Sequence, residues 1–206
     1  AKGVFGEGHP QFVGVSGAGG HDTVAGFFAT RPETLLVLGT RLGEVTSFLA
    51  PSAIPARRWI HVDVDPSAFA AAFPGTDGLG VVADVGAFLA ALDHRARATG
   101  WYDRPRPTSA IPHVGRPARL TAQDGDVRTP FVMQVVQDRV VDRTDAIVMS
   151  EAGNSFTWVN HALRFAAPGR YRTSAAWGSM GHFTTGPGVA SARSRAVARS
   201  ASRSTA

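Results

Sequence analysis

Hydrophobic positions along the first hundred residues fall into short apolar runs separated by longer stretches with helical spacing. The apolar runs are two to six residues long and rich in Val, Leu and Ile, which is typical of buried strands. The stretches between them have the apolar spacing of helices, and the last of these ends before a glycine. Strands are expected at 35–38, 59–64 and 81–82, and helices at 21–30, 42–50 and 85–98. Alternation of strand and helix predicts a parallel sheet with crossover connections.

The pattern changes after residue 98. Prolines and arginines replace the periodic spacing over 99–128, which indicates a linker. A helix is expected from 129 to 142 and a strand over 145–150, so a second α/β unit begins there. From 191 to 206 almost every residue is Ser, Ala or Arg, and we expect disorder because almost nothing there can be buried.

The fold class is therefore α/β, with an open parallel sheet that carries helices on both faces, an incomplete second α/β domain and a disordered basic tail. The expected parts are a nucleotide-binding type of domain at 1–98, the linker at 99–128, the second domain at 129–186 and the tail at 187–206.

Composition narrows the classes of protein. With 206 residues, 44% of them hydrophobic, the chain can bury one core and part of another. The absence of cysteine excludes disulfides and cysteine-ligated zinc and favours a cytoplasmic protein. No apolar run approaches the roughly 18 residues of a membrane span. Although the net charge is +5, four arginines lie in the tail without any acid, so the body is nearly neutral and a nucleic-acid partner is not expected.

One set of residues in the first domain has the character of a nucleotide site. Glycines at Gly17 and Gly20 allow close approach of a phosphate, and Arg41 follows a strand, where its guanidinium can bind phosphate. Asp65 and Asp84 follow later strands, where a carboxylate can accept hydrogen bonds from ribose hydroxyls. In the alternative interpretation the glycines serve turns and the two acids cap helices.

Several motifs of this domain occur in a fixed order. They are Lys2-Gly3-Val4-Phe5, His9-Pro10, Leu38-Gly39-Thr40-Arg41, His61-Val62-Asp63-Val64-Asp65-Pro66 and Ala83-Asp84-Val85. In this order they resemble the central domain of thiamine-diphosphate-dependent enzymes of the acetolactate-synthase type. The resemblance implies a parallel sheet that binds FAD in some members, binds ADP in others and is structural in many.

A second set of residues surrounds the expected strand at 145–150. Glu151-Ala152-Gly153-Asn154-Ser155 follows the strand, where backbone N–H groups and short polar side chains suit a diphosphate. Further on, Gly178-Ser179-Met180-Gly181 places one large apolar side chain between flexible positions. Taken alone, this second segment also fits a turn with a methionine in the core.

The order of these two segments resembles the start of the diphosphate-binding domain of the same enzymes. The resemblance implies that Gly153, Asn154 and Ser155 contact the diphosphate of the cofactor. It also implies that the backbone near Gly178 and Ser179 binds the aminopyrimidine, and that Met180 supports the bent cofactor. The reaction implied is decarboxylation or carboligation of a 2-keto acid, by a lyase or transferase that forms a homo-oligomer.

The same resemblance requires residues that the chain does not match. An activating glutamate on a preceding domain has no counterpart, and no Gly-Asp-Gly motif with a downstream Asn for Mg²⁺ follows Gly181. No catalytic or metal-ligating residue is therefore assigned. We expect an internal piece of a longer enzyme, inactive alone, whose tail is read out of frame. The alternative is a non-catalytic module that binds FAD or ADP.

Overall fold

The computed structural model describes residues 2–50, 57–75, 77–104, 113–115, 117–121, 125, 127–174, 178, 180 and 181. The chain divides into two compact units. The first unit spans Ser16–Val114, and the second combines Ala1–Val15 with Gly115–Ala206. The expected tail at 187–206 lies outside the described residues, and so does much of the expected linker.

The first unit is built on a parallel sheet, as the sequence predicts. Strands β1 (Thr34–Leu38), β2 (Arg58–Asp63) and β3 (Gly78–Val82) are hydrogen-bonded in the order β1-β2-β3. In this register Leu36 of β1 faces Ile60 of β2, which faces Leu79 of β3. All three carboxyl ends therefore lie along one edge of the sheet, where ligands of open α/β sheets bind.

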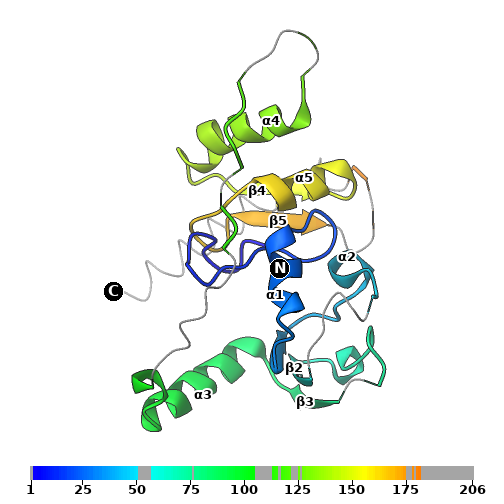
Figure 1. The fold of residues 1–206 in the computed structure, drawn as a ribbon, viewed down its shortest axis with the longest axis vertical. Helices are drawn as coiled ribbons and strands as arrows, with labels where there is room; N and C mark the ends of the chain where they lie inside the picture. Colours follow the sequence, from blue (N-terminus) through cyan, green and yellow to red (C-terminus); the bar gives the residue numbers. More distant parts are fainter. Residues whose placement is uncertain are drawn as a thin grey trace, which may run out of the picture. The chain divides into compact units, whose positions relative to one another are not determined.

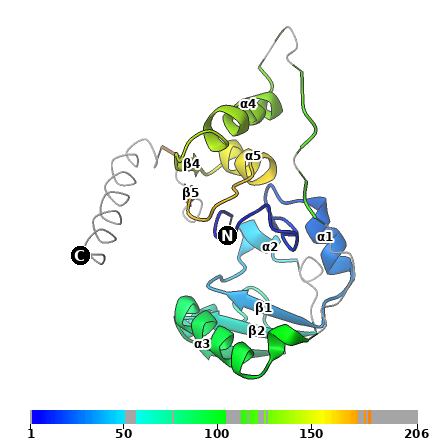
Figure 2. The ribbon, with the colours of Figure 1, turned by 90° about the vertical axis from the view of Figure 1, so that its left-hand side faces the viewer.

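Helices pack against both faces of this sheet (Figure 2). On one face Trp59, Val37, Leu42 and Phe73 form a buried cluster, which Phe28 of α1 (Asp22–Ala29) joins. The opposite face carries α3 (Val85–Ala98), whose first residue packs against Gly39 at the end of β1. Both results confirm the predicted fold class. The short elements of this unit are α2 (Glu44–Ser47), η2 (Pro66–Ala68) and η3 (Trp101–Asp103).

The second unit holds a smaller parallel pair of strands (Figure 1). Strands β4 (Val148–Glu151) and β5 (Tyr171–Ser174) are joined through α5 (Asn154–Ala162). Before them, α4 (Thr129–Val136) continues into a single π-helical turn, η4 (Gln137–Val141). The core of this unit consists of Val141, Val159, Leu163, Phe165 and Tyr171.

Two polar side chains satisfy backbone groups around the end of η4. The Gln137 amide donates to the Arg164 carbonyl at 3.0 Å and accepts from the Arg164 N–H at 2.8 Å. The Arg170 guanidinium donates to the carbonyls of Val141, Thr144 and Ala146, which lie in and after the last turn. These bonds supply the partners that carbonyls at a helix C-terminus lack.

The N-terminal segment packs in the second unit, whereas the sequence interpretation placed it in the first domain. Lys2 and Glu7 form an ion pair at 3.0 Å, and each side chain is only 1% exposed. The Glu7 carboxylate also accepts from the Phe165 N–H at 3.3 Å, and the Glu7 N–H donates to the Phe165 carbonyl at 3.0 Å. A buried pair of this kind ties residues far apart in sequence, because separating the charges would leave one of them unpaired.

Gly17 is required by close backbone packing in the first unit. Its φ is +78°, a region that side chains disfavour. A Cβ at this position would lie 2.1 Å from the Val45 carbonyl oxygen, where no atom can fit. Ala18 next to it donates its N–H to the same Val45 carbonyl at 2.8 Å. Helix α2, which contains Val45, is therefore held directly against this glycine.

We predict that Gly17→Ala destabilises the first unit by about 2–4 kcal/mol, since both the clash and the positive φ oppose the new methyl group. Gly26→Ala is the matched control, because Gly26 lies within α1 and its added Cβ would meet nothing within 4 Å. The control should be neutral or slightly stabilising. Urea unfolding of both variants measures the difference, and equal stabilities would contradict the packing role of Gly17.

The buried ion pair predicts a pH dependence of stability. Burial outweighs the attraction of Glu7 and lowers the pKa of Lys2 from 10.5 to about 8. Between about pH 8 and about pH 10.5 the unfolded chain then binds more protons at this site than the folded chain does. Stability contributed by this site should therefore rise with pH across that window.

The measurement is the difference in unfolding free energy between the natural chain and Lys2→Met, followed through α5 amide signals in urea. This difference should grow in favour of the natural chain as the pH rises from about 8 to about 10.5. A difference that stays constant or shrinks across the window would contradict the lowered pKa.

Candidate functional site

The carboxyl end of β4 presents a sharp backbone bend. Parallel pairing sets Glu151 of β4 opposite Ser174 of β5, so both strands end at the same level. Two residues later Gly153 has φ +100° and ψ −153°, a combination open only to glycine. The bend leads directly into α5, whose first residue is Asn154. A glycine is thus needed to turn the chain from strand into helix at this point.

The N-terminus of α5 is open. Gly153, Asn154 and Ser155 are exposed, and no side chain caps the helix. The first N–H groups of a helix have no partner within the helix, and together with the helix dipole they attract anions. The Ser155 hydroxyl donates to the Glu151 carbonyl at 3.0 Å, so its own hydrogen points back along the helix. Backbone N–H groups and the exposed side-chain amide of Asn154 are therefore the donors available for an anion here.

The second predicted segment lies beside this helix start. The N–H of Gly181 donates to the Glu151 carboxylate at 2.7 Å, across 30 positions of sequence. Gly178 and Gly181 both have positive φ, and the Met180 side chain is 83% exposed. Ser179, which the sequence interpretation also assigns to the cofactor, lies outside the described residues. The structure thus brings together the two segments that the sequence interpretation assigned to one cofactor.

A buried pair of hydroxyl groups lies next to the end of β4. Ser150 and Tyr171 share a hydrogen bond of 2.6 Å between their side-chain oxygens, and both residues are buried. Burial raises the pKa of Tyr171, against the opposing effect of the bond to Ser150. Tyr171 also stacks on Phe165, whose N–H donates to the Glu7 carboxylate and whose carbonyl accepts from the Glu7 N–H. The sequence offers no local signal for this pairing, because the partners lie on different strands.

The nucleotide-type residues of the first unit are engaged with one another. Arg41 and Asp65 form an exposed ion pair at 3.2 Å at the carboxyl edge of the sheet. Hydrogen bonds from Ser67, followed by the guanidinium of Arg41, lower the pKa of Asp65. Asp65 caps η2 through the Ser67 N–H, and Asp84 caps α3 through the Ala87 N–H. These contacts match the capping interpretation, and the nucleotide-binding role stays a prediction.

The two glycines of that set, Gly17 and Gly20, take part in backbone contacts. Gly17 faces the backbone of Val45 and Thr46, as described above. Gly20 donates its N–H to the Gly17 carbonyl at 2.8 Å and closes a turn. Their positions therefore have a structural reason that does not involve a phosphate.

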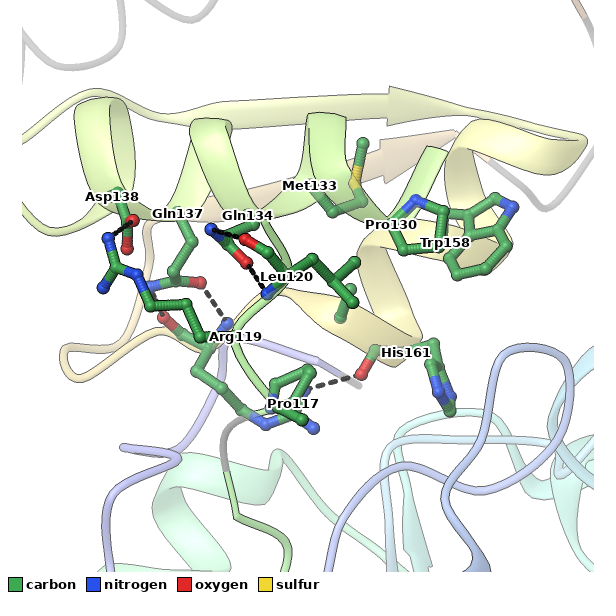
Figure 3. Close-up of a pocket in the computed structure, with 13 residues that line it drawn as sticks. Pro117, Arg119, Leu120, Pro130, Met133, Gln134, Gln137, Asp138, Trp158 and His161 are labelled. Carbon is green, nitrogen blue, oxygen red and sulfur yellow. Dashed lines mark hydrogen bonds and ion pairs between the residues drawn. The ribbon is translucent and has the colours of Figure 1, made fainter. Parts of the chain in front are cut away.

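A cavity of about 450 Å³ lies elsewhere in the second unit, between the segment at 117–121, α4 and α5 (Figure 3). Trp158, Pro130 and Met133 line one end, and the Arg119–Asp138 ion pair borders the other. The Gln134 side chain bonds both backbone groups of Leu120 and holds the outer segment in place. None of the residues predicted to bind a cofactor lines this cavity.

Two further findings concern the described part of the chain. Within it, no three His, Asp or Glu side chains gather into a potential metal site. None of the helices described is long and apolar enough to cross a membrane.

The chain is similar to known thiamine pyrophosphate enzymes. Residues 1–92 match the family model described as thiamine pyrophosphate enzyme, central domain. A probable acetolactate synthase large subunit of Methanocaldococcus jannaschii is 26% identical, over 87% of this chain and 31% of the relative. An acetolactate synthase large subunit of Mycobacterium tuberculosis is 26% identical, over 88% of this chain and 29% of the relative.

A solved structure has the same fold. The thiamine diphosphate-dependent 4-hydroxybenzoylformate decarboxylase of Rhodococcus jostii RHA1 superposes with a TM-score of 0.58 and 23% sequence identity. The match covers 84% of this chain and 31% of that protein. The chain thus spans about a third of the length of the relatives it matches. Residues 1–92 thus match the central domain of the thiamine pyrophosphate enzyme family, and the relatives support a fragment of a thiamine-diphosphate-dependent enzyme.

Proposed function

We propose that this chain contributes the central domain and the diphosphate end of the cofactor site to an enzyme that decarboxylates or ligates 2-keto acids. The observation that carries the proposal is the open N-terminus of α5, which directly follows the glycine bend at the end of β4. An uncapped helix start at the carboxyl end of a parallel strand is suited to a diphosphate.

Some residues at the start of α5 suit the diphosphate of the cofactor. Gly153 leaves space above the helix start, since a Cβ there would meet nothing within 4 Å, and Asn154 is exposed beside it. Met180 offers an exposed apolar side chain close in sequence to Gly181, which is bonded to Glu151. When bound, thiamine diphosphate supplies an electron sink for the carbanion left by decarboxylation. The role of this chain is then to bind and orient the cofactor and to shield it from water.

The remaining parts of the proposal follow the acetolactate-synthase resemblance. Mg²⁺, if bound, would require oxygen ligands, and the motifs that this chain shares with the acetolactate-synthase type supply none. We further propose that the complete enzyme is a cytoplasmic homo-oligomer, and that FAD or ADP at the first unit is an additional option of the family. A ribose contact would require carboxylates that are not already bonded. Asp65 and Asp84 both cap helices, which favours a structural role for the first unit over nucleotide binding.

Binding of thiamine diphosphate tests the proposal. With Mg²⁺ present, saturation-transfer NMR should detect thiamine diphosphate on the chain but not thiamine, because the helix start recognises the diphosphate. Gly153→Ala should abolish the signal, since alanine is strained at φ +100° and would move the helix start. Gly169→Ala, strained in the same way at φ +81° in the same unit, is the matched control and should keep binding. Equal signals from thiamine and its diphosphate would contradict the proposed site.

Turnover is a separate prediction. Given pyruvate, thiamine diphosphate and Mg²⁺, the purified chain should release no more CO₂ than the cofactor alone does. We expect this because no residue of the chain matches the glutamate that activates the cofactor in enzymes of the acetolactate-synthase type. Saturable CO₂ release that depends on the chain would show that the chain is catalytically sufficient and would overturn this part.

A further inference from the structure

We infer that Glu151 is a positioning residue of the cofactor site, whose carboxylate holds the segment of Gly178, Met180 and Gly181 at the start of α5. This inference rests on the proposed function. The segment is called the Met180 segment below. It deepens the proposal by assigning an acidic side chain at the diphosphate end to a task other than binding phosphate or metal.

The first step is geometric. Glu151 is the last residue of β4, so its backbone is fixed by the ladder with β5 and its position varies little. From there its carboxylate accepts the Gly181 N–H at 2.7 Å, the distance of a strong hydrogen bond to a charged group. The end of β4 is therefore hydrogen-bonded to Gly181, which lies 30 positions further along the chain.

The Met180 segment contains two glycines and an exposed methionine. Gly178 and Gly181 have φ of +62° and +81°, and nothing lies within 4 Å of a Cβ at either position. Met180 between them is 83% exposed, so it is not anchored by burial. Two glycines and an unburied methionine have little packing of their own to order them. The bond from the Gly181 N–H to Glu151 is therefore one constraint on where Met180 lies.

The third step is electrostatic. A free carboxylate next to the α5 start would repel a diphosphate, whose charge the N–H groups there attract. Bonding to Gly181 directs the Glu151 carboxylate to the other segment and satisfies it with a donor. Glu151 can then lie near the diphosphate and still contribute to cofactor binding, by holding the Met180 segment. The same arrangement explains why an amide, which also accepts a hydrogen bond, should replace the carboxylate well.

The test compares two variants of the full chain by amide hydrogen exchange of Gly181 without cofactor. Glu151→Ala removes the acceptor, so exchange at Gly181 should accelerate about tenfold or more. Glu151→Gln keeps an acceptor oxygen and should restore exchange to within a few-fold of the natural rate. Asp145→Ala is the matched control, because Asp145 is an exposed acid shortly before the same strand. Unchanged Gly153 and Gly169 signals verify that each variant is folded.

Saturation transfer from thiamine diphosphate then reads the positioning role. Binding should fall in Glu151→Ala and be retained in Glu151→Gln and Asp145→Ala. If Gly181 exchanges equally fast in Glu151→Ala and in the natural chain, Glu151 does not hold the segment and the inference is wrong. If exchange accelerates but binding is unaffected, the positioning role is wrong although the contact exists.

Failure of the proposed function looks different. In that case the natural chain itself shows no transfer from thiamine diphosphate, whatever the Gly181 exchange rates are. The cofactor role of Glu151 would then fall with the proposed function. Slow Gly181 exchange in the natural chain with fast exchange in Glu151→Ala would still establish the contact.

Discussion

The second unit depends on the buried ion pair between Lys2 and Glu7. Its charges are shielded from water, and Glu7 adds two backbone-linked bonds to Phe165, 158 positions away. Phe165 stacks on Tyr171, which in turn bonds Ser150 at the end of β4. A continuous chain of buried contacts therefore runs from the N-terminal segment to the strand end that carries the candidate site. Removing one charge of such a pair is costly, so the N-terminal segment stays packed against Phe165.

The two candidate sites differ in how their polar groups are satisfied. At the sheet edge of the first unit, Arg41 pairs with Asp65, while Asp65 and Asp84 also cap helices, so a ligand would have to displace existing bonds. At the end of β4 the helix start has no side-chain cap, and the nearby acid is directed to Gly181. Backbone N–H groups without a side-chain cap, beside a glycine bend, are suited to an anion. This contrast favours the second unit as the place where a phosphate group binds.

Local patterns predicted the first unit well, because its elements are set by nearby residues. The helix expected at 85–98 is α3, and the strands at 35–38 and 59–64 are β1 and β2 with ends shifted by one residue. The sequence did not reveal β5, a short strand of mostly polar residues, nor the π-helical turn η4. It also gave no sign that residues 2–15 pack with the second unit, since contacts across 158 positions leave no periodic pattern. For the candidate site, motifs identified Gly153 and Met180, but a carboxylate bonded to a backbone N–H can be seen only in the fold.

Amide chemical-shift mapping with thiamine diphosphate and Mg²⁺ tests the central claim most directly. The account predicts that the N–H signals of Gly153, Asn154 and Ser155 move on addition of the cofactor, together with those of Gly178 and Gly181. Signals of Gly17 and Gly20 in the first unit should stay in place. Shifts confined to Gly17, Gly20 and their neighbours, with the start of α5 unaffected, would contradict the account and assign phosphate recognition to the first unit.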